Sequence, residues 1–122
     1  MKEVAIVGVG VHPWGKFPGK TFPDLAQVAI RKALEDAGLR WTDIQLIAGG
    51  EAPYVGTTGM QAGSTISERM GFHGIPVVNI WNACATGGFT LATARAFIAS
   101  GYCDIALCVG SFIAPGGFFG AQ

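Results

Sequence analysis

Apolar residues fall into four short continuous runs separated by glycine- and proline-containing segments. The runs that we predict as strands are Glu3 to Gly10, Asp43 to Gly49, Pro76 to Ile80 and Ile105 to Gly110. The first run is rich in β-branched residues and ends in glycine, which is typical of a parallel strand buried on both faces. We therefore expect a sheet whose strands have little polar surface.

Helical segments are predicted between these strands. Thr21 to Gly38 begins with a capping pattern that includes Pro23 and Asp24, shows amphipathic periodicity and ends at a glycine. Met60 to Met70 follows a glycine-rich loop and is predicted as a second helix. Strands and helices thus alternate, which predicts an α/β fold with a largely parallel sheet and right-handed crossovers.

The third predicted helix, Thr86 to Ser100, differs from the first because it is apolar on every side. Its only ionisable residue is Arg95. Such a helix belongs in the centre of a larger structure, because no face is suited to water. It is too short, and too rich in Thr, Ser and Gly, to cross a membrane. We therefore predict a buried central helix.

Cys84 is the candidate nucleophile, because it lies where the strand ending at Ile80 turns into this helix. Free N–H groups and the dipole at a helix start favour a thiolate, and the backbone N–H of Cys84 could stabilise an oxyanion. Small neighbours such as Ala83 and Gly87 leave room for a substrate. Inert packing is the common alternative for a cysteine in this position. Asn79 and Asn82 are expected to satisfy nearby backbone groups.

Composition narrows the classes of function. The 122 residues carry no net charge, with 50% hydrophobic and 13% charged residues, which is typical of a piece of something larger. The absence of a basic cluster argues against nucleic acid and anionic membranes as partners. We find neither a signal peptide nor a membrane span, so we expect a cytoplasmic protein. The Gly8-Val9-Gly10 sequence lacks the rest of a nucleotide-binding glycine motif.

The remaining cysteines and histidines do not complete a site. Cys103 and Cys108 are predicted to be structural, and three cysteines without ligand spacing give no metal site. A cysteine nucleophile needs an acid or base partner. Neither His12 nor His73 lies in a setting that indicates this role for Cys84, so a complete catalytic set is not visible in this chain.

Two long sequence motifs carry a family resemblance. VVNIWNACATGG, followed by an alanine-rich helix and GYCDIALCVG, resembles the nucleophile region of the thiolase superfamily. Within it, the chain is most similar to the thiolases of the sterol carrier protein and lipid-transfer type. The opening, VAIVGVGVHPWGKFPGKTFPDLAQVAIRKALEDAGL, resembles the start of the same family. The resemblance covers nearly the whole chain.

The resemblance implies a fold, an activity and partners. Cys84 would be acylated by an acyl-CoA, in an enzyme that forms or cleaves C–C bonds next to a thioester. Coenzyme A would be a co-substrate, with no bound cofactor. The family fold has two similar halves in a five-layered α/β/α/β/α arrangement and usually forms homodimers, and some members work with a partner that carries a zinc ribbon and an OB fold.

The resemblance also implies that residues 1–122 are the N-terminal part of a thiolase-like domain whose C-terminal half is absent. The family's histidine in a Gly-His-Pro setting and its later cysteine or histidine have no match here. Two alternatives stay open. One is a non-catalytic lipid-transfer or partner-binding subunit that uses Phe112, Phe118 and Phe119. The other is a retro-aldolase on the same fold.

Overall fold

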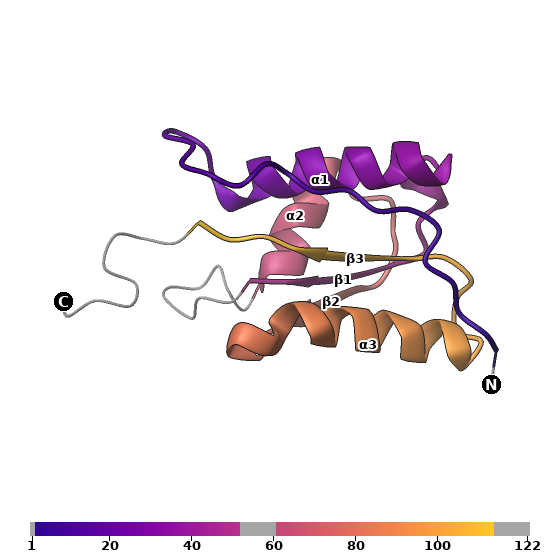
Figure 1. Cartoon of the computed structure of the whole chain (residues 1–122). Coiled ribbons are helices and arrows are strands. Elements are labelled where there is room, and N and C mark those ends of the chain that lie inside the picture. The colour runs from indigo at the N-terminus through magenta and orange to yellow at the C-terminus, as the bar shows by residue number, and fades with distance from the viewer. Residues whose placement is uncertain (1, 52–60, 114–122) are drawn as a thin grey trace.

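The computed structural model describes residues 2–51 and 61–113 as three layers, in which a parallel sheet lies between helices (Figure 1). The predicted loop at 52–59 and the phenylalanines Phe118 and Phe119 lie outside the described residues. Helices α1 and α2 cover one face of the sheet and α3 covers the other. The elements are α1 (Phe22–Ala37), β1 (Leu46–Gly50), α2 (Ala62–Met70), β2 (Val77–Ile80), α3 (Thr86–Ala99) and β3 (Ala106–Gly110), with short 3₁₀ helices η1 (Trp41–Asp43) and η3 (Ala83–Ala85).

Strand β1 is the centre of the sheet, whose order is β2-β1-β3. All five of its residues are buried, and both neighbours run parallel to it. Gly50 lies opposite Ile80 on β2 and Gly110 on β3, so all three strands end at one edge. This confirms the predicted α/β class and the parallel pairing. The strand begins at Leu46, three residues later than predicted, because Trp41–Asp43 form η1.

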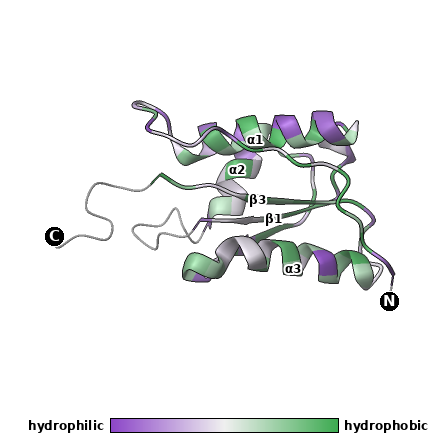
Figure 2. Ribbon diagram, in the orientation of Figure 1, coloured by the Kyte–Doolittle hydropathy of each residue, from purple (hydrophilic) through white to green (hydrophobic). Residues whose placement is uncertain are grey.

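Helix α1 confirms the amphipathic, capped helix predicted from its sequence. The Asp24 carboxylate accepts hydrogen bonds from the Thr21 N–H (2.8 Å) and the Thr21 hydroxyl (2.9 Å), and Gly38 ends the helix with φ 68°. Arg69 of α2 pairs with the same carboxylate. The apolar face packs Ile30 into a core shared with Ile47 and Ile66, while polar side chains face outward (Figure 2).

Helix α3 lies where predicted, but the prediction of a buried central helix holds for one side only. Small and hydroxyl-bearing residues face the sheet: Thr86, Thr90, Ala94 and Ala99 are buried. Phe89 and Leu91 are 49% and 48% exposed, because the sheet is the only described layer that covers α3. None of the described helices has the length and apolar character that a bilayer crossing requires.

The predicted strand from Glu3 to Gly10 is wrong. This segment has no regular structure and runs along α1, with Ile6 and Val9 70% and 67% exposed (Figure 1). Its polar backbone groups are bound by α1 side chains instead of a strand: Asp36 Oδ2 accepts from Val9 N at 2.9 Å, and Lys32 Nζ donates to the carbonyl of Val11. Glycine permits this close approach, since a Cβ on Gly10 would lie 2.2 Å from the Ala29 carbonyl oxygen.

Candidate functional site

Cys84 lies in the tight turn η3 between β2 and α3, and its side chain is exposed. The residue before it, Ala83, has φ 45°, a conformation that costs a non-glycine residue energy and persists only where the surroundings hold it. The Thr86 hydroxyl holds it: Oγ1 accepts from Asn82 N at 2.9 Å and donates to the Ala83 carbonyl at 2.7 Å. Thr86 thus fixes the backbone on both sides of the strained residue and sets where Cys84 lies.

The end of β1 packs directly against this turn. An added Cβ on Gly50 would come within 2.3 Å of Thr86 Cγ2 and 2.7 Å of the Ile80 carbonyl oxygen. Only a glycine allows α3 to begin this close to the central strand. The carboxyl edge of the sheet and the first turn of α3 therefore form one rigid unit around Cys84.

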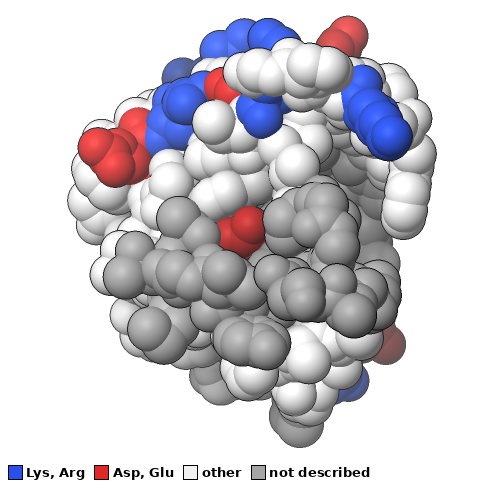
Figure 3. Space-filling model, turned by 90° about the vertical axis from the view of Figure 1, so that its left-hand side faces the viewer, with Lys and Arg blue, Asp and Glu red and all other residues white. Residues whose placement is uncertain are grey.

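A cavity of about 440 Å³ opens beside Cys84. It lies at the carboxyl edge of the strands, where Gly50 and Gly110 line it. Figure 3 shows that edge of the molecule, with Lys and Arg side chains gathered toward the α1 side. Clefts at this edge are the usual ligand sites of open α/β sheets. The residues that line it are Gly10, Val11, His12, Pro13, Trp14, Gly15, Phe17, Leu25, Ala29, Gly50, Glu51, Ala83, Cys84, Thr86, Gly87, Gly110, Ser111 and Phe112.

Glu51, which was not among the residues predicted from the sequence, also lines this cavity. Its side chain follows Gly50 directly, is 7% exposed, and its Oε2 has no hydrogen-bond partner. Burial raises the pKa of this carboxyl group above its ordinary value, because desolvation penalises the charged form. The feature of the sequence that could have indicated Glu51 is an acidic residue directly after the strand that is buried along its whole length.

The two histidines have different settings. His12 is half-buried and lines the cavity that Cys84 lines, which the sequence analysis did not foresee. Its Nδ1 lies 2.8 Å from the Pro13 carbonyl oxygen, which only accepts, so Nδ1 is the donor in this contact. His73 is not among the described residues that line the Cys84 cavity. It contacts the Ile44 carbonyl at 2.9 Å and packs edge-on against Trp41, which fits a structural role.

The other sequence-predicted polar residues serve the framework. Asn79 Oδ1 accepts from Ser64 N at 2.9 Å and so caps the start of α2. Cys103 is buried, and the Cys108 thiol lies 3.6 Å from the Thr90 carbonyl oxygen on the sheet side of α3. Burial raises the pKa of both thiols. These settings agree with the predicted structural roles and separate both cysteines from Cys84.

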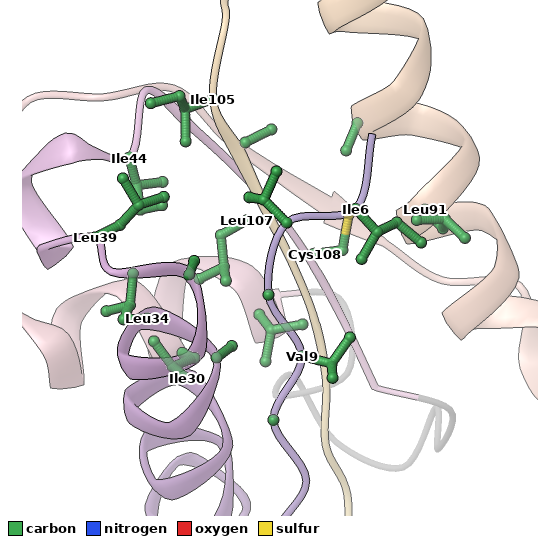
Figure 4. A pocket seen from close by; sticks show the side chains of 18 of the residues that line it. Ile6, Val9, Ile30, Leu34, Leu39, Ile44, Leu91, Ile105, Leu107 and Cys108 are labelled. Atoms are coloured by element: carbon green, nitrogen blue, oxygen red, sulfur yellow. The ribbon is translucent and has the colours of Figure 1, made fainter. Parts of the chain in front are cut away.

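A second cavity, of about 430 Å³, is lined mainly by apolar side chains, with Arg95 also in its lining (Figure 4). Side chains from the N-terminal segment, α1, α3 and β3 surround it, among them Ile6, Ile30, Leu91 and Leu107. It shares Gly10, Val11, Ala29 and Gly110 with the lining of the Cys84 cavity. The two cavities are therefore adjacent.

The chain belongs to the thiolase family, because residues 4–111 match the thiolase N-terminal domain. It is 36% identical over 118 residues to a Caenorhabditis elegans non-specific lipid-transfer protein-like 2, covering 93% of this chain and 28% of that protein. It is 35% identical over 114 residues to human sterol carrier protein 2 (90% and 20%). An acetyl-CoA acetyltransferase of Methanothermobacter thermautotrophicus is 34% identical over 119 residues (90% and 29%). The chain spans between a fifth and a third of these relatives.

Solved structures show the same fold. One is Xanthomonas campestris OleA C143S with bound lauric acid and lauroyl-CoA, with a TM-score of 0.69 and 23% identity over 84% of this chain and 30% of that chain. Another is the 3-oxoacyl-[acyl-carrier-protein] synthase III of Aquifex aeolicus, with a TM-score of 0.64 and 23% identity over 75% and 30%. The layered α/β arrangement described above is thus that of thiolase-fold proteins.

Proposed function

We propose that this chain is the nucleophile-bearing part of a thiolase-type acyltransferase, in which Cys84 accepts the acyl group of an acyl-CoA. One observation carries the proposal: an exposed thiol held at the start of α3 by a buried Thr86 that bridges a strained residue. A structural cysteine has no need of such a turn. The cavity beside it provides space for a thioester.

We assign to this turn only the first half-reaction, in which the acyl enzyme forms on Cys84. The Cys84 sulfur attacks the thioester carbonyl, and the backbone N–H of Cys84 is the donor that we propose for the developing oxyanion. Coenzyme A leaves as a thiol, so it is a co-substrate. The second half of a C–C bond-forming or bond-cleaving cycle needs further acid and base groups, which we propose lie in the part of the family fold beyond this chain.

We further propose that the exposed apolar side of α3 associates with the other half of the family fold. Phe89 and Leu91 present an apolar surface next to the site. Charge-poor surface of this kind is typical of an interface within a fold or between subunits. The cytoplasmic location expected from the sequence and the homodimer expected from the family resemblance are part of this proposal.

Incubation of the purified protein with acetyl-CoA, followed by peptide mass analysis, tests the function. We expect one acetyl group on the Cys84 peptide and none in Cys84→Ala. Cys108→Ala is the matched control and should label as the wild type does. Acetylation of Cys103 or Cys108 at the rate of Cys84 would contradict the proposal.

A second candidate function, non-catalytic lipid binding, is favoured by the apolar cavity of Figure 4 and by the lipid-transfer relatives. Leu91 lines that cavity, whereas Phe89 is equally exposed on α3 and does not. If the cavity binds an acyl chain, Leu91→Asp should weaken binding of a fluorescent fatty acid and Phe89→Asp should leave it unchanged. Equal effects of both substitutions would contradict cavity binding.

A further inference from the structure

Trp14 is the most exposed of the large apolar side chains in the described residues, with an exposed fraction of 95%. It also lines the cavity that Cys84 lines. A ring that lines a cavity and is almost wholly exposed lies at the mouth of that cavity. Because an aromatic side chain of this size contributes strongly to binding once a partner covers it, Trp14 is a surface suited to a flat ligand group.

The loop at residues 11–20 places Trp14 across the strand ends from Cys84. This loop leads into α1 on one side of the sheet, whereas Cys84 lies in the turn before α3 on the other side, at the same end of the molecule (Figure 1). Between them the cavity passes over the carboxyl ends of the strands, where Gly50 and Gly110 line it. A ligand that contacts both Cys84 and Trp14 must therefore be long, because it extends from one helical layer to the other.

Contacts on both sides of Trp14 fix the path of the loop. Lys32 Nζ of α1 donates to the Val11 carbonyl oxygen at 3.1 Å. The rings of His12 and Phe17 meet edge-on, with their centroids 4.6 Å apart, and both residues are half-buried. Trp14 thus projects from between two anchored points. A side chain on an ordered loop loses less conformational freedom when a ligand binds, which favours binding at this position.

Charge differs between the two ends of the cavity. The loop carries two lysines, Lys16 and Lys20, and no acidic residue, and both lysines are exposed. Figure 3 shows further Lys and Arg side chains toward the α1 side of this edge. The described lining of the cavity itself contains neither Lys nor Arg, and Cys84 lies on its far side from the loop. This distribution favours a ligand whose anionic end lies at Trp14 and whose neutral end lies at Cys84.

We propose that Trp14 binds the adenine ring of coenzyme A, with Lys16 and Lys20 facing its phosphate groups, an inference that rests on the acyl transfer proposed above. Coenzyme A carries its sulfur at one end and a phosphorylated adenosine at the other, joined by a long uncharged arm. The adenine stacks on the indole, and the ammonium groups attract the phosphates. The arm lies over the strand ends. Trp14 is thus a binding residue and takes no part in the bond changes at Cys84.

The experiment compares two acetyl donors with the same reacting thioester, acetyl-CoA and S-acetyl-N-acetylcysteamine, which lacks the nucleotide. Mass spectrometry gives the initial rate of Cys84 acetylation at donor concentrations below saturation. Trp14→Ala should lower the rate with acetyl-CoA by about tenfold, because stacking on the base is lost, and should leave the rate with the short donor unchanged. Trp14→Phe, which keeps an aromatic ring, should retain most of the acetyl-CoA rate.

Phe72→Ala is the matched control for the aromatic substitution. Phe72 is 67% exposed and is not among the described residues that line the cavity, so this variant should behave as the wild type does with both donors. Replacing both Lys16 and Lys20 by glutamine should lower the acetyl-CoA rate at low ionic strength, and the loss should shrink as salt is added, because salt screens exposed charges. An acetyl-CoA rate that is independent of these lysines overturns the assigned phosphate contact.

Other outcomes overturn the proposal as a whole. A Trp14→Ala variant with the wild-type rate for both donors shows that the ring binds no part of coenzyme A, while the acyl-enzyme function stands. An equal loss with both donors shows that Trp14 supports the fold around Cys84 instead of binding the nucleotide. A wild-type protein that uses both donors equally well has no nucleotide site. A wild-type protein that takes no acetyl group from either donor removes the proposed function and this inference with it.

Discussion

Helices α1 and α3 lie on opposite faces of one sheet and are held in place in opposite ways. Helix α1 carries its own caps, with Asp24 at the start and Gly38 at the end, and its outer side is polar. At the start of α3, Thr86 holds the preceding turn, and the exposed side of the helix is apolar apart from Arg95. Helix α1 therefore covers the core with an apolar inner face and presents a polar surface to solvent. Helix α3, in contrast, begins directly after the turn that contains Cys84, and apolar side chains such as Phe89 and Leu91 are exposed on it.

The largest expected effect separates the two cysteines at α3. Cys84 precedes the helix and is exposed, whereas Cys108 lies beneath it and bonds to the Thr90 carbonyl. Iodoacetamide should therefore alkylate Cys84 faster than Cys108 by about tenfold or more at neutral pH, because the half-buried Cys108 thiol has a raised pKa and is less often the reactive thiolate. Peptide mass analysis over time measures both rates in one sample. Equal rates would remove the distinction between a functional and a structural thiol.

The contact between β1 and α3 gives the next effect. Gly50→Ala places a methyl group 2.3 Å from Thr86 Cγ2, so one element must move. Overpacking of this kind costs about 1–3 kcal/mol in the free energy of unfolding, which denaturant titration measures. Gly88→Ala is the matched control, because nothing lies within 4 Å of its Cβ position, and a helical alanine should stabilise the chain. Equal stability of the two variants would contradict the close contact.

Removal of the Thr86 hydroxyl tests the turn itself. Thr86→Val keeps the shape but leaves Asn82 N–H and the Ala83 carbonyl without this partner, at a cost of about 1–2 kcal/mol. Acetylation of Cys84 should slow, because the strained Ala83 is no longer held. Thr90→Val removes the equivalent bond to the Gly87 carbonyl, one turn further along, and should leave acetylation unchanged. A Thr86→Val variant with full acetylation would contradict the positioning role.

The smallest effect concerns the cap of α1. The Thr21 N–H and Arg69 lower the pKa of Asp24 to about 2, so its ionised form stabilises the folded chain. This contribution is present above the ordinary pKa of an aspartate and is lost as the pH falls toward 2. Asp24→Asn should therefore lower Tm at neutral pH, and the difference from the wild type should shrink at low pH. A difference that is independent of pH would argue against the charged cap.

The same contrast explains what could be predicted from the sequence. Helix α1 was predictable because Thr21, Asp24 and Gly38 define its ends locally. The turn at Cys84 was predictable because a short apolar strand and an apolar helix adjoin there. The apolar run ending at Gly10 was not, since a strand forms only where an edge receives it, and here α1 side chains bind the backbone instead. His12 could not be placed, because only packing brings it to the Cys84 cavity, whereas the position of Glu51 directly after the central strand was a usable signal.

The central claim is that the start of α3 makes Cys84 an acyl acceptor. The most direct test is to expose the protein to acetyl-CoA and follow, by intact mass and peptide mapping, where and how fast an acetyl group appears. The account predicts a single acetyl group on Cys84, released by hydroxylamine as a thioester is. A protein that acquires no acetyl group, or acquires it on lysines and on Cys108 as readily as on Cys84, would contradict it.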